Sequence, residues 1–170
     1  GAGGGIGVHM LMLARWARTR VIAIDIAAEK FSACRKAGAD EIIDASEGNV
    51  AEALLSLTGG DGVDVVIDFV SAASTLEAGA AALGRRGRLV TLGGAGEKFQ
   101  VDARAMLLKE QDLLGSRYVT RSEVLDALDL VASGDIWPMV TDIRPLEEAE
   151  ALHERLENGA VTGRAALLIG

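Results

Sequence analysis

The sequence is poor in several residue types on which whole protein classes depend. Its single cysteine, Cys34, excludes an internal disulfide and a cysteine-based zinc site. Two tryptophans, one tyrosine and three phenylalanines are too few for an aromatic-rich sandwich core, and no apolar run approaches the roughly 18–20 residues of a membrane span. We therefore expect a protein of the reducing cytoplasm with no membrane partner.

Basic residues are also scarce. The chain has 17 lysines and arginines against 25 aspartates and glutamates, which gives a net charge of −8. A nucleic-acid-binding surface needs an excess of positive charge, and so does attraction to an anionic membrane. The charge balance therefore predicts no nucleic-acid partner.

Strand and helix patterns alternate along the 170 residues, which are about the size of one domain. Such alternation is typical of an α/β fold with a doubly wound parallel sheet and helices on both faces. The apolar run at 64–70 should be buried on both faces, and Ser122 and Pro145 should begin their helices. We predict strands at 20–25, 41–44, 64–70, 88–92, 112–116 and 165–169, and helices at 7–16, 29–37, 49–57, 74–83, 103–108, 122–133 and 145–156.

The first seven residues, Gly-Ala-Gly-Gly-Gly-Ile-Gly, form a candidate phosphate loop. A backbone that wraps a pyrophosphate leaves no room for Cβ atoms, and the following helix directs free amides at the phosphate oxygens. The loop fits the pattern G-x-x-G-G-x-G, although Ile6 stands where the stricter G-x-G-x-x-G has its last glycine. A flexible glycine turn is the alternative interpretation. The four pattern glycines are Gly1, Gly4, Gly5 and Gly7.

Asp25 ends the next predicted strand, 18 residues after Gly7. A carboxylate there can accept hydrogen bonds from both hydroxyls of an adenosine ribose and repels a 2′-phosphate, so it predicts NAD and not NADP. Asp25 could instead cap the helix that begins near Ala28. Lys30 could reach the same ribose or a phosphate, or be a solvated lysine of the first helical turn.

Ordered motifs along essentially all of the chain resemble the cofactor-binding domain of zinc-type medium-chain alcohol dehydrogenases and reductases. They are GAGGGIG, VIAIDIAAEK, AGADEIID, GVDVVIDFV, GRLVTLGG, LLGSRYVTRSE and GRAALLI, in family order and spacing. The resemblance implies one Rossmann-type NAD-binding domain over residues 1–170, whose last strand, near 165–169, joins the family's other domain. In the family's sheet the central strand precedes the glycine loop, so we expect it before residue 1.

The resemblance also implies a role for each cofactor-binding residue. The loop from Gly4 through Ile6 to Gly7 would hold the pyrophosphate, Asp25 and Lys30 would bind the adenosine ribose, and Arg164 would reach a phosphate. Ser71 follows the apolar strand that ends at Val70, at the same sheet edge, where it could touch adenine or pyrophosphate. Val70 is also expected to bind the cofactor. Backbone groups of the remaining residues would line the nicotinamide: Leu92, Gly93, Gly94, Ser116 and Tyr118.

The implied enzyme is an NAD-dependent oxidoreductase that transfers hydride between an alcohol and its aldehyde or ketone. Zinc, expected in the full-length enzyme, would polarise the substrate oxygen. The family's zinc ligands and proton relay lie in a separate domain, mostly before residue 1, so we expect no catalytic residue and no metal ligand in this chain. The expected partner is a small alcohol or carbonyl substrate.

Three alternatives stay open. Zinc-independent quinone or enone reductases share the GAGGGIG loop, although they generally favour NADPH and lack an acid at the position of Asp25. A non-catalytic nucleotide-sensing module would use the same fold. A methyltransferase that uses S-adenosylmethionine also has a glycine loop and an acid, but it should end in an antiparallel hairpin, whereas strands and helices keep alternating here and glycines stand at 93–94 and 115.

Few other residues suggest chemistry. His9 and His153 have no cysteine, histidine or carboxylate at metal spacing, so we interpret His9 as a helix residue beside the loop and His153 as a solvated position. Cys34 should be a packed or surface thiol. The arginine cluster at 85–88 should form a solvated turn at the strand end opposite the cofactor.

The strand from Asp112 to Tyr118 should lie at a sheet edge and pair with a second copy, because such an edge offers unpaired backbone groups beside Leu113 and Leu114. The resembling family forms dimers by joining such edges, so we expect a homodimer or a dimer of dimers. Alternatively, the segment from Val140 to Arg144 covers this edge.

Overall fold

The computed structural model describes residues 1–94 and 96–170. These residues divide into two compact units, one made of Gly1–Ser46 with Val119–Gly170 and the other of Glu47–Tyr118. Each unit contains parallel strands and helices, as the alternating pattern predicts. The prediction of one domain over residues 1–170 stays a prediction.

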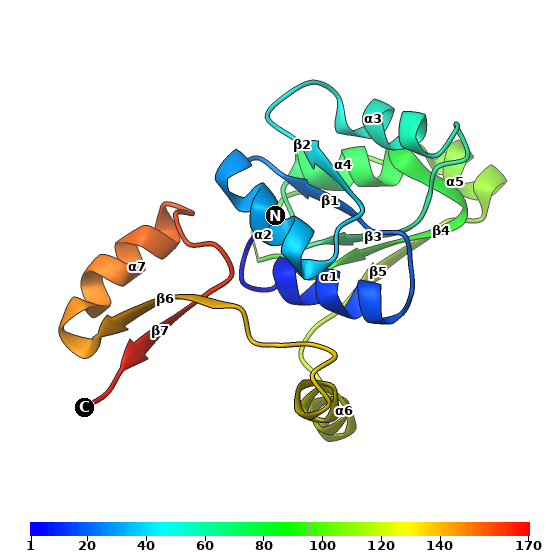
Figure 1. The fold of residues 1–170 in the computed structure, drawn as a ribbon. Coiled ribbons are helices and arrows are strands. Elements are labelled where there is room, and N and C mark those ends of the chain that lie inside the picture. Colours follow the sequence, from blue (N-terminus) through cyan, green and yellow to red (C-terminus); the bar gives the residue numbers. More distant parts are fainter. Residues whose placement is uncertain (95) are drawn as a thin grey trace. The chain divides into compact units, whose positions relative to one another are not determined.

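The first unit contains two pairs of parallel strands, β1 with β2 and β6 with β7 (Figure 1). Helices α1 and α2 pack against each other, and α7 packs on β6. Val8, Ala23 and Cys34 lie at the centre of its core, each no more than 1% exposed. The elements are α1 (Gly7–Trp16), β1 (Ile22–Asp25), η1 (Ala28–Lys30), α2 (Phe31–Ala37), β2 (Glu41–Asp44), α6 (Arg121–Ala132), β6 (Val140–Pro145), η2 (Leu146–Glu148), α7 (Ala149–Glu157) and β7 (Arg164–Leu168).

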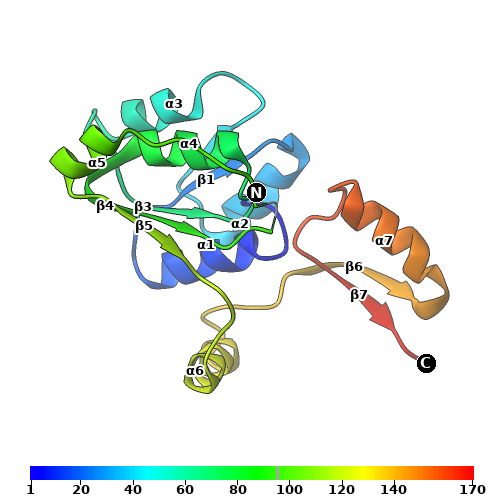
Figure 2. The same cartoon turned by 180° about the vertical axis from the view of Figure 1, so that it is seen from behind.

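The second unit is a three-stranded parallel sheet in the order β3-β4-β5, with α4 packed on β3 and β4 (Figure 2). Its buried core consists of Leu76, Leu83 and Leu89. β5 has β4 as its only strand neighbour among the described residues, so it is an edge strand, as predicted. The elements are α3 (Val50–Leu57), β3 (Val63–Asp68), α4 (Ala73–Ala82), β4 (Leu83–Thr91), α5 (Ala103–Lys109) and β5 (Asp112–Gly115).

These findings confirm the parallel α/β class. In a sheet of order 3-2-1-4-5-6, the second strand along the chain pairs with the third, and the fourth, fifth and sixth strands lie side by side in that order. β1 and β2 pair as the second and third strands of such a sheet do, and β3, β4 and β5 follow the order of its fourth, fifth and sixth. Within the described part of the chain, no backbone ladder joins the three sets of strands.

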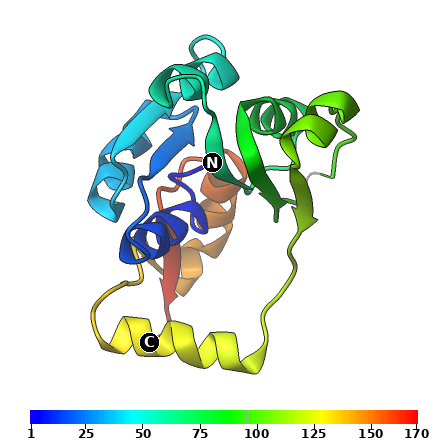
Figure 3. The ribbon, with the colours of Figure 1, turned by 90° about the vertical axis from the view of Figure 1, so that its right-hand side faces the viewer.

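Three local predictions were wrong. A strand at Val140–Pro145 was missed because its two large apolar residues, Val140 and Ile143, are three positions apart and so give no strand-type alternation; the strand pairs with β7. Pro145 ends this strand and is the N-cap of η2, so it is not the first helical residue, and the helical segment begins one residue later, at Leu146. The helix predicted from Ser122 is capped by Thr120, whose hydroxyl accepts from the amide of Glu123 at 3.3 Å. That helix is α6, the yellow one in Figure 3.

The strand β3 also departs from its prediction. Asp64 is exposed and Val65 is 50% exposed, so the run is not buried on both faces. The reason is that β3 pairs only with β4 among the described residues. In β4, which begins at Leu83, the arginine cluster at 85–88 is largely exposed, and residues 84–87 fall in the register shift between the two strands.

Candidate functional site

The glycine loop is anchored to the carboxyl end of β1. The amide of Ala2 donates to the carbonyl of Ile24 at 3.0 Å, and the amide of Gly3 donates to Oδ2 of Asp25 at 2.8 Å. The next residues then turn into α1, where Val8 donates to the carbonyl of Gly4 at 3.1 Å. The glycine loop, predicted to bind phosphate, is therefore hydrogen-bonded directly to Asp25, which is predicted to bind ribose.

Several loop glycines have no room for a side chain. A Cβ on Gly7 would lie 2.4 Å from the carbonyl oxygen of Ala2, and a Cβ on Gly3 would lie 2.5 Å from the Cβ of Lys30. A Cβ on Gly5 would lie 2.9 Å from Cδ of Arg164. The loop is therefore a packed element, and the alternative of a flexible glycine turn is wrong.

The N-terminus of α1 has unused hydrogen-bond donors. Its N-cap residue, Ile6, makes no side-chain cap bond, and no acid occupies the first turn. Among the residues that the structure describes, the amides of Gly5, Ile6 and Gly7 donate no hydrogen bond. Three consecutive free amides at the positive end of a helix dipole are well suited to an anion such as a pyrophosphate.

The Asp25 carboxylate lies at the end of β1 and is only 5% exposed. Its Oδ1 accepts from the amide of Ala27 at 3.1 Å, and its Oδ2 accepts from Gly3. Oδ2 also lies 4.0 Å from the N-terminal amino group of Gly1, and each carboxylate oxygen has the capacity to accept a second hydrogen bond. Asp25 does not cap the following helix, because the N-cap of η1 is Ala27, so that alternative is wrong.

Lys30 is 9% exposed, and its aliphatic stem packs on Gly3. The stem of Lys30 is therefore packed and not solvated, contrary to the alternative interpretation. In the described part of the chain, no hydrogen bond or ion pair is made by its Nζ, and no buried side-chain nitrogen lacks a partner. The ammonium group therefore reaches solvent beside the loop.

Arg164 begins β7 and lies against the loop at Gly5. The amide of Gly163 donates to the carbonyl of Gly3 at 3.0 Å and so holds this end of β7 in place. Sequence reasoning missed Gly3, Gly163 and His9, which together join the loop to distant segments. The G-x-G spacing of the loop could have revealed Gly3, whereas no local signal indicates the partners of the other two.

The remaining predicted residues belong to the second unit and follow the carboxyl ends of its strands. A Cβ on Gly93 would lie 2.4 Å from the backbone of Val70, so these two segments touch. Ser71, 5% exposed and with φ of 60°, bonds to Oγ1 of Thr91 at 2.6 Å. Leu92, Gly94, Ser116 and Tyr118 lie in the segments after β4 and β5.

Tyr118 is 82% exposed, with a φ of 60° that is rare for a residue with a side chain. The guanidinium of Arg117 stacks over its ring at 4.5 Å from the centroid. Cys34, in contrast, is fully buried in the first unit, and this burial raises the pKa of its thiol. It is a packed thiol, as predicted, and remains protonated at neutral pH.

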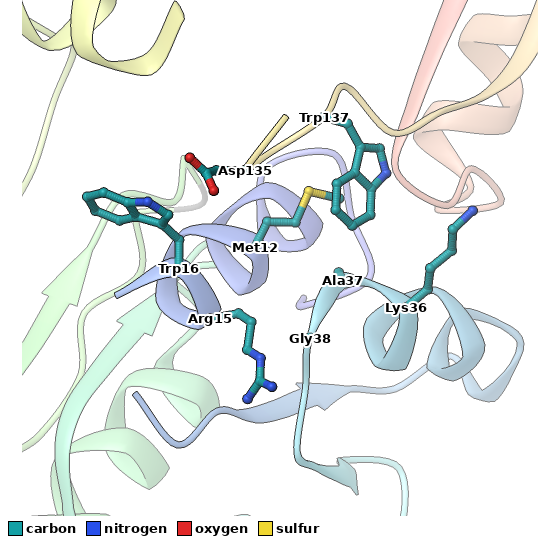
Figure 4. Close-up of a pocket in the computed structure, with 8 residues that line it drawn as sticks. All are labelled: Met12, Arg15, Trp16, Lys36, Ala37, Gly38, Asp135 and Trp137. Carbon is teal, nitrogen blue, oxygen red and sulfur yellow. The ribbon is translucent and has the colours of Figure 1, made fainter. Parts of the chain in front are cut away.

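A cavity of about 250 Å³ lies near the C-terminal end of α1, away from the glycine loop (Figure 4). It contains both tryptophans of the chain, and the side chain of Met12 lies between them. Because the loop is at the other end of the helix, this cavity is separate from the candidate dinucleotide site. Its lining residues are Met12, Arg15, Trp16, Lys36, Ala37, Gly38, Asp135 and Trp137.

The described residues form neither a metal site nor a helix that could span a membrane. No group of three or more histidine, cysteine, aspartate or glutamate side chains among them could hold a metal ion. None of their helices combines the length and apolar character needed to cross a membrane.

Comparisons with known proteins identify the family of the chain. The zinc-binding dehydrogenase family matches residues 5–133. An NAD-dependent alcohol dehydrogenase of Sulfurisphaera tokodaii is 32% identical over 169 residues, which cover 99% of this chain and 49% of that protein. The crystal structure of the alcohol dehydrogenase from the hyperthermophilic archaeon Aeropyrum pernix is 34% identical, with a TM-score of 0.91, and the match covers 99% of this chain and 48% of that one.

A third similar structure, Escherichia coli quinone oxidoreductase complexed with NADPH, is 30% identical with a TM-score of 0.79, and the match covers 98% of this chain and 55% of that one. The chain thus spans about half the length of the relatives that it matches. These matches confirm the resemblance carried by the ordered motifs, and the chain belongs to the zinc-binding dehydrogenase family.

Proposed function

We propose that this chain is the NAD-binding domain of a dehydrogenase that transfers hydride between an alcohol and its aldehyde or ketone. The observation that carries the proposal is the bond between Gly3 and Asp25, which fixes a buried carboxylate beside a loop with free amides. The relatives described as NAD-dependent alcohol dehydrogenases favour this substrate class.

The residues of the first unit fit a dinucleotide. The free amides of Gly5, Ile6 and Gly7 would bind the pyrophosphate, and Arg164 would add a positive charge beside them. Gly1 and Gly4 would contribute backbone groups to the loop beside the pyrophosphate. The open acceptor positions of Asp25 would receive the two ribose hydroxyls, with Lys30 beside them. NAD, when bound, supplies the carbon that accepts or returns the hydride.

The residues of the second unit would serve the nicotinamide half. We propose that backbone groups of Leu92, Gly93, Gly94, Ser116 and Tyr118 orient the ring, and that Val70 contacts the cofactor at the end of β3. Gly93 and Gly94 leave their backbone uncovered by side chains, which suits hydrogen bonding to a carboxamide and close packing on a planar ring.

Selection of NAD would depend on charge. The 2′-phosphate of NADP would bring negative charge next to the Asp25 carboxylate. Because this carboxylate is only 5% exposed, solvent would screen the repulsion poorly. Lys30 lies close enough to Gly3 to offset part of that repulsion, but it cannot supply the hydroxyl acceptor that Asp25 provides.

A quinone reductase is the second candidate function, because the chain is 30% identical to a quinone oxidoreductase complexed with NADPH. The buried acid at the end of β1 favours the first candidate, since NADPH would bring a phosphate to it. The described residues contain no cluster that fits zinc, so we propose no metal-dependent step for this chain.

The test is a substrate panel on the full-length protein. Oxidation of primary or secondary alcohols with NAD is expected, whereas reduction of quinones with NADPH and no alcohol oxidation would overturn the proposal. The 170-residue chain alone should bind NAD and show no turnover. Turnover that survives chelation and repurification would mean that catalytic residues lie in this chain. We also keep the cytoplasm as the expected compartment.

A further inference from the structure

We propose that His9 is a positioning residue that locks the glycine loop to the segment bearing Arg164, so that the loop is held in its binding conformation. This inference rests on the proposed dinucleotide function for its purpose. Its geometry depends only on contacts within the first unit.

Both ring nitrogens of His9 are engaged. Nδ1 lies 2.8 Å from the carbonyl oxygen of Gly5, one helical turn earlier, and Nε2 lies 3.1 Å from the amide nitrogen of Met139. A backbone amide can only donate, so Nε2 must be the unprotonated acceptor. The ring is therefore neutral, and its proton is on Nδ1, from which it donates to the Gly5 carbonyl.

The bridge continues from Met139 back to the loop. The carbonyl of Met139 accepts from the amide of Arg164 at 2.8 Å, and the amide of Gly163 donates to the carbonyl of Gly3 at 3.0 Å. The chain thus forms a closed circuit from Gly5 through the imidazole to Met139, along the start of β7, and back to the loop.

Two features make this circuit rigid. Gly163 has a φ of 65°, and a Cβ there would lie 2.6 Å from the carbonyl oxygen of Met139, so the segments are in tight contact. Arg164 in turn lies against Gly5. Release of the imidazole would therefore leave the Gly5 carbonyl without this bond, and among the described residues the segment that carries the guanidinium would be held to the loop by the bond between Gly163 and Gly3 alone.

These two hydrogen bonds also exclude His9 as a group that transfers a proton to or from the substrate. A ring with one nitrogen donating to a carbonyl and the other accepting from an amide has no free position for a substrate proton. Its role is to orient the peptide units of the loop, whose amides at Gly5, Ile6 and Gly7 donate no hydrogen bond among the described residues and so are available to a phosphate.

Three substitutions of His9 in the full chain test its contacts with Gly5 and Met139 separately and together. His9→Asn places an amide nitrogen near the position of Nδ1 and keeps the Gly5 contact. His9→Gln places an oxygen near the position of Nε2 and keeps the Met139 contact. His9→Leu loses both contacts. His153→Leu is the matched control, since this second histidine is exposed on α7.

The first measurements are independent of NAD. Ring ¹⁵N shifts of His9 should show the neutral tautomer protonated on Nδ1, and amide exchange of Met139 should be about tenfold faster in His9→Leu than in wild type. A tautomer protonated on Nε2, or unchanged Met139 exchange in His9→Leu, would overturn the inference.

Calorimetric NAD titration supplies the second measurement. The Kd should rise about tenfold in His9→Leu and by less in His9→Asn and His9→Gln, while His153→Leu matches wild type. In the full-length protein KM for NAD should rise while kcat stays unchanged. A wild-type Kd in His9→Leu would overturn the positioning role. If the wild-type chain binds no NAD, the proposed function is overturned. The tautomer of His9 and the amide exchange of Met139 would still show whether His9 bridges the two segments.

Discussion

The amide of Gly3 donates to Oδ2 of Asp25 at 2.8 Å, and this bond joins the glycine loop to the acid at the end of β1. The amide holds a carboxylate that is 5% exposed in one orientation, and its loop neighbours present free amides next to it. A dinucleotide needs anion and hydroxyl recognition a few ångströms apart. This one hydrogen bond therefore joins the loop proposed to bind the anion to the carboxylate proposed to bind the hydroxyls.

Gly7→Ala should weaken NAD binding strongly, whereas Gly4→Ala should be tolerated. A Cβ on Gly7 would lie 2.4 Å from one backbone carbonyl and 2.5 Å from another, so the loop must move. A Cβ on Gly4 would lie 3.4 Å from the carbonyl oxygen of Gly1, which is an ordinary contact. We expect NAD affinity to fall by at least about tenfold in the first variant only.

Calorimetry on the two variants checks this prediction, with far-UV circular dichroism to verify that both fold. Equal affinities in Gly7→Ala and Gly4→Ala would show that the close approach at Gly7 does not shape the site.

Much of the local structure could be predicted from the sequence because its signals are short-range. Asn49 caps α3 as its position indicates, and Gly38 ends α2 with a φ of 109°. The loop and Asp25 were likewise recognisable, since a helix start and a strand end are both local patterns.

The connections between distant segments could not be predicted in this way. His9 meets Met139 across 130 positions, and nothing in the residues around either one indicates the other. The burial of Lys30 depends on its packing against Gly3, which is also non-local. β6 was missed because Val140 and Ile143 do not alternate as the apolar residues of a strand do, and its pairing with β7 is a non-local contact.

Asp142 should make stability depend on pH in the acid range. The hydrogen bond from Arg144, at 2.6 Å, is the main cause that lowers the pKa of Asp142, and Arg155 adds to it. A carboxylate with a lowered folded-state pKa stabilises the fold above its unfolded pKa, near 3.9, and this contribution is lost as pH falls through the folded value. Asp142→Asn should remove that contribution at neutral pH.

Urea unfolding from about pH 3 to about pH 6 tests this sign. The difference between wild type and Asp142→Asn should shrink as pH falls. Asp126→Asn, which alters an exposed carboxylate on α6, should leave the midpoint unchanged. A difference that grows toward low pH would contradict the assignment.

Arg18→Gly should stabilise the chain by about 0.5–1 kcal/mol. Arg18 follows α1 with a φ of 59°, a left-handed conformation that costs a residue with a Cβ more than glycine. Ala17→Gly, one position earlier at φ −70°, is the matched control and should destabilise. Denaturant midpoints of the two variants should therefore move in opposite directions, and a lowered midpoint for Arg18→Gly would refute the argument.

Leu114→Lys should produce a monomer if copies pair through β5. Leu114 is 45% exposed on this edge strand, and a lysine there would place charge in the joint between two sheets. Leu128→Lys, which alters a 57% exposed side chain on α6, should leave the dimer intact. Sedimentation of both variants is the test, and a Leu114→Lys dimer would show that the contact lies elsewhere.

The most direct test of the account is the affinity of this chain for NAD and for NADP, measured by calorimetry in the same buffer. NAD should bind more tightly than NADP, and Asp25→Asn should weaken NAD binding by about 1–3 kcal/mol, the range for a hydrogen bond to a charged group. Asp44→Asn, at the corresponding end of β2, is the control and should bind NAD as wild type does. A lower Kd for NADP than for NAD would contradict the central claim that Asp25 selects the cofactor.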